Sequence, residues 1–263
     1  MIKRLLIPIL FIFAASFAFS QTERLEKSPR HQEWVVVKQG NRSVHCFVVY
    51  PAKKEKTTTV IVIHENKGLT DFERTIADQL AEAGYIAIAP DLLSGTGPNG
   101  GKTSDFPSTD AATEGIYKLP PEQVTADLNA IADYAIQLPA SNGKLAVGGF
   151  CWGGGQTFRF ATNRTGLKAA FPFYGSFQHT KEDLKKITAP VYGFYGGNDA
   201  RINATLPETE ANMKELGKTF EYVIYEGADH GFMRRGAEKD SSEANKKAHD
   251  QAWERWKKLL SGL

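Results

Sequence analysis

The chain has 263 residues, 24% of them charged, and a formal net charge of +2. A balance this close to neutral gives no electrostatic reason to expect nucleic acid or an anionic membrane surface as a partner. A chain of this length can bury the core of one domain, and no repeat or low-complexity tract in the sequence marks a second.

The first twenty residues have the pattern of a secretory signal peptide. Lys3 and Arg4 precede an uncharged stretch that ends in the small-residue site Ala18-Phe19-Ser20. A membrane anchor is the alternative, but a spanning helix needs about 20 apolar residues, and this stretch is shorter and contains a proline. We therefore expect a signal peptide over residues 1–20 and a single domain over residues 21–263. The mature protein should be exported, to the periplasm or the medium, and should not be held at a membrane.

An antiparallel hairpin is predicted next. Two β-rich segments, Glu33–Lys38 and Val44–Tyr50, are separated by the turn-forming residues Gln39-Gly40-Asn41-Arg42. The pattern then changes, because short β-branched segments begin to alternate with helical ones. Such alternation predicts an α/β fold with a mostly parallel sheet, helices on both faces and the hairpin at its edge.

The predicted elements follow in chain order. The strands are Thr59–Ile63, Tyr85–Ala89, Lys144–Gly149, Lys168–Tyr174, Val191–Tyr195 and Phe220–Tyr225. The helices run from a capping box at Thr70-Asp71-Phe72-Glu73 to about Gly84, and over Pro121–Gln137, Gly153–Thr162, Thr205–Leu216 and about Ser242–Leu260. In such sheets ligands bind beyond the carboxyl ends of the strands, so residues just after each strand are the candidates for function.

The stretch from Asp91 to Pro120 does not fit this pattern. It is rich in glycine and proline and has little periodicity. Loops of this length are usually functional or disordered. It is therefore either a surface excursion that covers the site or an ordinary mobile insertion.

A glycine-rich turn follows the strand Lys144–Gly149 and opens the next helix. It reads Gly149-Phe150-Cys151-Trp152-Gly153, which is the spacing of a nucleophile elbow with cysteine in place of serine. Glycines are needed there because the strand turns at once into a helix and leaves no room for a Cβ. The helix N-terminus favours negative charge, so we expect the pKa of Cys151 to fall below the usual value of about 8.5.

An acid and a histidine follow the nucleophile, each just past a strand. Asp199 comes after Val191–Tyr195, and His230 comes after Phe220–Tyr225. This is the chain order of an α/β-hydrolase triad, in which His230 accepts the thiol proton and Asp199 orients the imidazole. Asp229 competes for the acid role, but it adjoins His230 in sequence and its side chain should point elsewhere. His64 is interpreted as a structural neighbour of Glu65.

Five motifs in this order resemble the dienelactone hydrolase family, whose type activity is carboxymethylenebutenolidase. The resemblance extends from roughly Val60 to Trp256 and implies the α/β-hydrolase fold. The motifs are Ile63-His64-Glu65-Asn66, Ala89-Pro90-Asp91-Leu92, Gly149-Phe150-Cys151-Trp152-Gly153-Gly154, Gly197-Asn198-Asp199 and Asp229-His230-Gly231-Phe232.

The resemblance implies roles for further residues. Glu65 matches a glutamate that contacts the resting nucleophile and helps to generate the thiolate; otherwise it is a solvated loop carboxylate. The backbone N–H groups of Trp152 and Asn66 match an oxyanion hole, and Arg234 matches one of two arginines that bind a substrate carboxylate. The second arginine should follow Leu92 but is missing from the sequence. Its charge would have to come from another basic residue, the candidates being Lys67, Lys102 and Arg201.

A cysteine nucleophile restricts the substrate. A thiolate leaves a tetrahedral intermediate far more readily than an alkoxide, so simple alkyl esters should revert, whereas enol lactones, aryl esters and thioesters should react forward. We expect a hydrolase for activated esters or enol lactones that acts through an acyl-cysteine, as a monomer, on a small-molecule substrate. The sequence has no metal-ligand cluster or cofactor fingerprint, so we expect neither group.

Three alternatives stay open. The protein is a thioesterase or aryl esterase with a different substrate, or an exported ligand-binding protein that has kept the fold without the chemistry. The third is a structural protein in which a disulfide joins Cys46 to Cys151, as exported chains allow.

Overall fold

The structure, a computed structural model, describes residues 21–176 and 178–263. The predicted signal peptide, residues 1–20, lies outside the described residues. None of the helices in this part of the chain combines the length and the apolar character needed to cross a bilayer.

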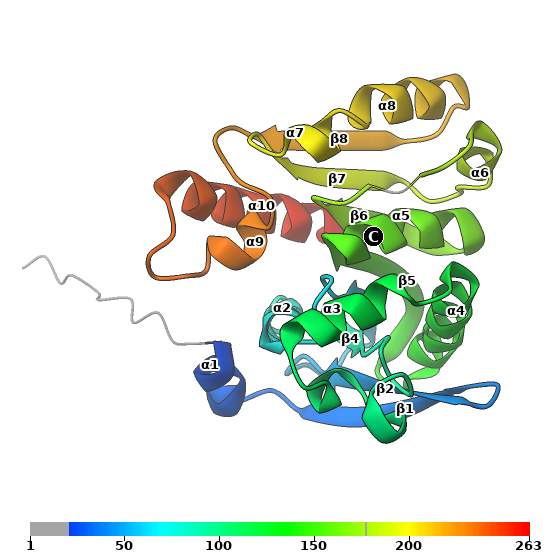
Figure 1. Ribbon diagram of the computed structural model, residues 1–263, viewed down its shortest axis with the longest axis vertical. Helices are drawn as coiled ribbons and strands as arrows, with labels where there is room; N and C mark the ends of the chain where they lie inside the picture. The colour runs from blue at the N-terminus through cyan, green and yellow to red at the C-terminus, as the bar shows by residue number, and fades with distance from the viewer. Residues whose placement is uncertain (1–20, 177) are drawn as a thin grey trace, which may run out of the picture.

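The core of the molecule is one sheet of eight strands in the order β1-β2-β4-β3-β5-β6-β7-β8 (Figure 1). The β1–β2 and β2–β4 pairs are antiparallel, and all other pairs are parallel, which confirms the predicted hairpin at the edge of a mostly parallel sheet. The strands are β1 (Gln32–Gln39), β2 (Arg42–Val49), β3 (Thr57–Ile63), β4 (Ile86–Pro90), β5 (Ser141–Phe150), β6 (Leu167–Phe173), β7 (Val191–Gly196) and β8 (Phe220–Tyr225).

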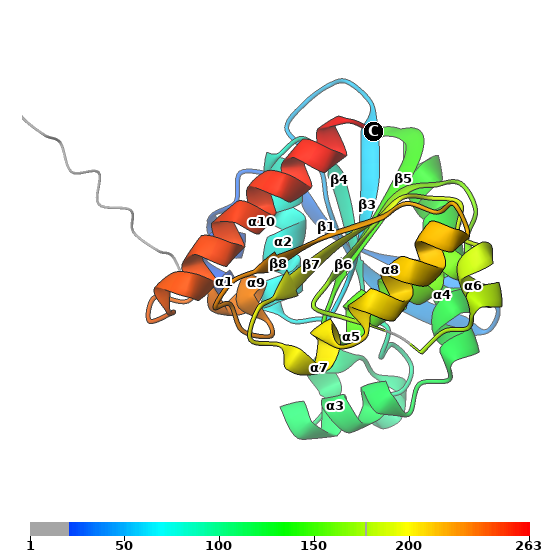
Figure 2. The same cartoon turned by 90° about the horizontal axis from the view of Figure 1, so that it is seen from above.

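Helices cover both faces of the sheet (Figure 2). They are α1 (Gln21–Lys27), α2 (Asp71–Glu82), α3 (Thr109–Tyr117), α4 (Pro121–Gln137), α5 (Trp152–Asn163), α6 (Lys181–Lys185), α7 (Ala200–Asn203), α8 (Leu206–Glu215), α9 (Phe232–Arg235) and α10 (Glu243–Ser261), with short 3₁₀ turns η1 (Pro98–Gly100) and η2 (Thr103–Asp105). All the longer predicted helices and strands are therefore present.

Strand β3 shows why the sequence folds in this way. Every residue of β3 is buried. Ile61 and Ile63 pack into the core on the side of α4, α5 and α8, whereas Val60 and Val62 pack into the core on the side of α2 and α10. Successive side chains of a strand point to opposite faces, so a continuous β-branched run fits a strand that is covered on both sides.

The segment between β4 and α4 is ordered and packed. It contains η1, η2 and α3, and Leu93, Ala112 and Ile116 form a small core against which Trp152 packs. The carboxylate of Asp91 accepts hydrogen bonds from the N–H and hydroxyl groups of Thr103 at 3.0 and 2.7 Å, and so ties the segment back to the end of β4. The predicted excursion therefore includes a helix, α3, that lies against Trp152, next to Cys151.

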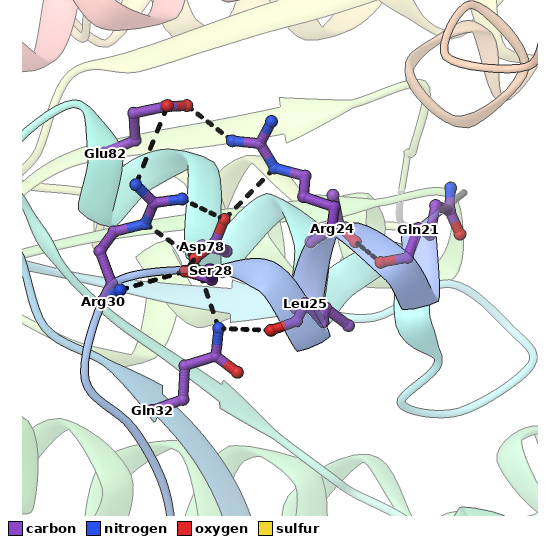
Figure 3. A network of polar contacts seen from close by, with 9 residues as sticks. Gln21, Arg24, Leu25, Ser28, Arg30, Gln32, Asp78 and Glu82 are labelled. Carbon is purple, nitrogen blue, oxygen red and sulfur yellow. Dashed lines mark hydrogen bonds and ion pairs between the residues drawn. The ribbon is translucent and has the colours of Figure 1, made fainter. Parts of the chain in front are cut away.

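A polar cluster anchors α1 to α2 (Figure 3). Asp78 of α2 has a fully buried side chain, and its carboxylate accepts two hydrogen bonds from Arg30, at 2.8 and 2.6 Å, and one from Arg24 at 3.2 Å. Burial alone would raise the pKa of Asp78, but the hydrogen bonds and charge of Arg30, together with a hydrogen bond from Ser28, lower it below the usual value. Helix α1 is polar and buries only Leu25, which explains why the sequence pattern did not predict it.

Candidate active site

Cys151 lies between the end of β5 and the first residue of α5. Its backbone adopts φ 54° and ψ −115°, a strained conformation that few residues other than glycine adopt. A Cβ on Gly149 would collide with the carbonyl oxygen of Gly153, and one on Gly153 would collide with the carbonyl oxygen of His64. The glycines of the motif are therefore required for close packing between the turn and the end of β3.

Three of the predicted site residues form a continuous hydrogen-bonded chain. The Cys151 Sγ lies 3.1 Å from Nε2 of His230, and Nδ1 of His230 lies 2.5 Å from Oδ2 of Asp199. Since Asp199 accepts the Nδ1 proton, Nε2 is free to accept the thiol proton. The other oxygen of Asp199, Oδ1, accepts the Ile202 N–H at 3.4 Å, so the carboxylate also caps α7.

Asp229 points away from this hydrogen-bonded chain, as its position next to His230 in the sequence predicts. Its carboxylate accepts hydrogen bonds from the side-chain amides of Asn198 at 3.1 Å and Asn245 at 2.9 Å. The structure therefore brings Asp199, and not Asp229, to His230.

Glu65, just after β3, is held by two side chains from distant parts of the sequence. The Tyr174 hydroxyl donates to Oε1 at 3.2 Å, and Nε of Arg234 donates to Oε2 at 3.0 Å. Arg234 also contacts Glu238 at 3.2 Å. Glu65 is only 5% exposed, so the interpretation as a solvated loop carboxylate was wrong.

Tyr174 was not identified from the sequence. It is fully buried, follows β6 with a φ of 37°, and places its ring edge-on to His230 with a centroid distance of 5.2 Å. Its position directly past the carboxyl end of a strand was the signal that could have found it.

The predicted fall in the pKa of Cys151 is not present in the structure. Burial of the thiol raises its pKa to about 11, and the nearby Glu65 carboxylate adds to this rise. Hydrogen bonds from the backbone N–H groups of Trp152 and Asn66, and the charge of Arg201, lower the pKa but do not outweigh burial. The N–H groups at the helix start are in place, yet desolvation of the sulfur dominates, so the thiol is protonated at neutral pH.

Two buried residues support the loop that carries Glu65 and Asn66. Nδ1 of His64 lies 2.8 Å from the Glu65 carbonyl oxygen, and Glu73 Oε1 accepts the Glu65 N–H at 2.9 Å. The other oxygen of Glu73 accepts from the Thr70 N–H and hydroxyl groups, which confirms the predicted capping box. Burial and the charge of Glu65 raise the pKa of Glu73 to about 7.

The three basic residues named as substitutes for the missing arginine lie in different surroundings. Lys67 is exposed, and Lys102 lines a separate hollow with Trp34 and His45. Arg201, in the first turn of α7, is the candidate whose charge acts on Cys151.

The disulfide alternative is wrong. Cys46 and Cys151 are both free, and Cys46 is fully buried in β2. Burial raises the pKa of Cys46 well above its usual range, which makes it an unreactive core residue.

Among the described residues, no group of three or more His, Cys, Asp or Glu side chains is arranged to hold a metal ion. The sheet and the strand–turn–helix at Cys151 define the chain as an α/β-hydrolase.

Comparison with known proteins narrows this class. The model of the dienelactone hydrolase family matches residues 44–262. A Salmonella typhimurium protein provisionally named carboxymethylenebutenolidase is 35% identical over 185 residues, which are 66% of this chain and 67% of that protein. A Saccharolobus solfataricus protein with the same provisional name is 30% identical, covering 82% of this chain and 93% of that protein.

A solved structure agrees with these relatives. A protein from Klebsiella pneumoniae, provisionally described as a dienelactone hydrolase, superimposes with a TM-score of 0.77 and 26% identity over 89% of this chain and 99% of that one. The chain belongs to the dienelactone hydrolase family and is a dienelactone hydrolase-like hydrolase.

Proposed function

We propose that the protein hydrolyses activated carboxylic esters or enol lactones by nucleophilic catalysis through Cys151. The observation that supports this most directly is the hydrogen-bonded chain from Sγ of Cys151 through His230 to Asp199, with distances of 3.1 and 2.5 Å. A nucleophile, a base and a group that orients the base within hydrogen-bond reach are the components of covalent acyl transfer.

The first half of the reaction forms an acyl-cysteine. Because the pKa of Cys151 is raised to about 11, the thiol gives its proton to Nε2 of His230 as the sulfur attacks the acyl carbon. The negative charge that develops on the carbonyl oxygen is stabilised by the N–H groups of Trp152 and Asn66, which in the resting protein lower the pKa of the Cys151 thiol. The carbon–oxygen bond to the leaving group breaks, and the leaving group takes the proton from His230.

Water completes the cycle. His230 removes a proton from water as the hydroxyl adds to the thioester carbon, the carbon–sulfur bond breaks, and the sulfur recovers the proton from His230. The products are a carboxylic acid and the free thiol enzyme. Asp199 stabilises the imidazolium formed in each half-reaction.

Arg234 supports recognition of a substrate that carries a carboxylate. It is 3.0 Å from Glu65 in the resting site, so a bound carboxylate would share the guanidinium with Glu65. Arg201 is the cation whose charge lowers the pKa of Cys151, and it takes the place of the arginine missing after Leu92.

The first experiment is a panel of esters that differ in leaving group. We expect p-nitrophenyl acetate and enol lactones to be cleaved at least about 100-fold faster than ethyl acetate, because the thiolate is expelled in preference to an alkoxide. Cys151→Ala should abolish turnover while leaving the thermal unfolding temperature nearly unchanged, with Cys46→Ala as the matched control. Equal rates on alkyl and aryl esters, or turnover by Cys151→Ala, would contradict the proposal.

The same panel separates the alternatives. A thioesterase would prefer acyl thioesters over both ester classes, and a binding protein would turn over none of them. Export is a separate proposal, supported by the sequence pattern of residues 1–20. Mass spectrometry of the protein from the periplasm and the medium should find a chain that starts at or close to Gln21.

A further inference from the structure

One peptide unit of the site has its carbonyl and its N–H group directed at different residues. It joins Glu65 to Asn66, and its N–H group acts on the Cys151 sulfur and lowers the pKa of the thiol. The C=O and N–H groups of a trans peptide lie in one plane and point in opposite directions. Whatever holds the carbonyl of Glu65 therefore also sets the direction of the Asn66 N–H.

His64 holds that carbonyl. Its Nδ1 lies 2.8 Å from the Glu65 oxygen, and the Leu92 N–H donates to its Nε2 at 3.3 Å. A neutral imidazole has one donor and one acceptor, so Nε2 accepts and Nδ1 carries the proton. Complete burial lowers the pKa of His64, which keeps the ring neutral and this arrangement intact.

The same ring supports the second N–H donor. His64 is stacked on the indole of Trp152, with ring centroids 5.4 Å apart and an interplanar angle of 13°. Its backbone carbonyl also lies where a Cβ on Gly153 would be, directly under the start of α5. His64 therefore contacts the residue or peptide behind each of the two N–H groups that face the sulfur.

Glu73 fixes the preceding peptide. Its carboxylate accepts the Glu65 N–H at 2.9 Å and the Thr70 N–H at 3.0 Å, and so closes the loop between them. His64 and Glu73 thus hold Glu65 on its carbonyl and amide sides. In the described part of the chain, neither side chain hydrogen-bonds to Cys151, His230 or Asp199.

We propose that His64 is a positioning residue that sets the geometry of the oxyanion hole. Its Nδ1–H fixes the plane of the Glu65–Asn66 peptide, and its ring supports Trp152, so that both N–H groups converge on one point. This inference rests on the proposed function, because it needs a carbonyl oxygen that becomes negative at that point.

Two amide substitutions test the hydrogen bond itself. His64→Asn places a donor near the position of Nδ1, His64→Gln places its amide near Nε2, and His64→Leu has no polar group. We expect His64→Leu and His64→Gln to lower the single-turnover rate of acylation by p-nitrophenyl acetate about 10- to 100-fold. A misaligned N–H group still stabilises the oxyanion in part, so the loss of rate is smaller than the loss caused by removing such a donor. His64→Asn should recover most of the rate, and KM should stay within about threefold in all three.

Alkylation by iodoacetamide distinguishes a role in the oxyanion hole from a purely structural role, because a general loss of structure would change the rates of acylation and alkylation alike. Alkylation displaces iodide at a saturated carbon and forms no oxyanion. Because the same N–H groups lower the pKa of Cys151, the thiolate fraction affects both reactions, and the ratio of the acylation rate to the alkylation rate removes it. We expect this ratio to fall about 10- to 100-fold in His64→Leu and His64→Gln, and to change less than about threefold in His64→Asn. Thermal unfolding confirms that each variant is folded. Should His64→Leu not fold, the comparison of the two amide variants still decides the question.

The outcomes are distinct. Acylation and alkylation that fall by the same factor, or acylation at the wild-type rate in both His64→Leu and His64→Gln, would overturn the role of His64. If the wild-type protein itself formed no acyl-enzyme, the proposed function would fail instead.

Discussion

The carboxylate of Glu73 lies directly behind Glu65 and accepts its backbone N–H at 2.9 Å. Two carboxyl groups are thereby kept close together in a buried region, one facing the nucleophile turn and the other closing the loop at Thr70. The charge of Glu65, added to the effect of burial, raises the pKa of Glu73 to about 7. This relationship has a measurable effect on stability.

Glu73→Gln should change how stability depends on pH. The folded-state pKa of Glu73 is about 7, above its ordinary value of 4.5, so the stabilisation from the protonated group is complete below about pH 4 and is lost as pH rises through 7. Relative to Glu73→Gln, the wild-type free energy of unfolding should fall by roughly 3 kcal/mol between pH 4.5 and 8, at 1.36 kcal/mol per unit of pKa. Urea unfolding across this range measures it, with the exposed Glu254→Gln as control. A difference independent of pH would show that the carboxyl titrates normally.

Glu65→Gln should separate thiol reactivity from turnover. The Glu65 charge raises the pKa of Cys151, so its removal should lower that pKa and increase the thiolate fraction at pH 8. We expect iodoacetamide to alkylate Cys151 about 3- to 10-fold faster, whereas ester turnover falls at least about 10-fold, because a Gln amide has one acceptor oxygen and no charge for the two donors, Arg234 and Tyr174, that bind Glu65. Cys151→Ala gives the background, to which the buried Cys46 should add little. Slower alkylation would contradict the electrostatic role of Glu65.

Asp199→Asn and Asp229→Asn make the same change at the two aspartates that were candidates for the acid. Asp199 bonds to Nδ1 of His230 at 2.5 Å, so an amide there would present the wrong hydrogen-bonding group to the imidazole. We expect kcat on p-nitrophenyl acetate to fall by about 10²- to 10⁴-fold. Asp229 is bound to Asn198 and Asn245, and its substitution should change kcat less than about threefold. A reversed order of effects would reassign the acid.

Arg30→Met should destabilise the protein by about 2–4 kcal/mol, because it leaves the buried Asp78 carboxylate with only Arg24 as a cationic partner. Arg24→Met should cost about 1 kcal/mol or less, since that guanidinium is partly exposed and Arg30 remains. The lowered pKa of Asp78 means that this stabilisation is present above about pH 4 and is lost as the pH falls further. Thermal unfolding at pH 7 and pH 3 measures both effects. Equal losses in the two variants would show that Arg30 has no special share in the network.

The order of strands and helices was predictable because each long element has a strong local pattern. Strand β3 is a continuous β-branched run, and α2 begins with a capping box at Thr70. Helices α1 and α3 lack such a signal, since α1 buries one residue and α3 buries only Ala112 and Ile116. They form because neighbouring elements provide partners for them.

The candidate site residues that directly follow strands were predictable from the sequence, whereas the properties of the site that depend on burial were not. Cys151, Asp199 and His230 follow three strands of one parallel sheet, so topology alone brings them together. The pKa of Cys151 was predicted in the wrong direction because burial and Glu65, both products of tertiary structure, outweigh the local helix start. His64 contacts Leu92 and Trp152, and Tyr174 contacts Glu65, across strands of the sheet, and a linear pattern does not contain such contacts.

Helix α3 lies outside the sheet but borders Trp152 and Asn66, whose N–H groups form the proposed oxyanion hole. It is carried by the segment between β4 and α4, packs on Trp152, and bonds the exposed Tyr117 to the Asn66 side chain at 3.3 Å. Cys151 and His230 follow strands of the sheet, whereas the segment between β4 and α4 supplies this neighbouring surface. An engineer who wishes to alter which acyl groups are accepted should therefore begin with exposed positions of α3 such as Tyr117, which lies beside Asn66 and is not part of the hydrogen-bonded chain from Cys151 to Asp199.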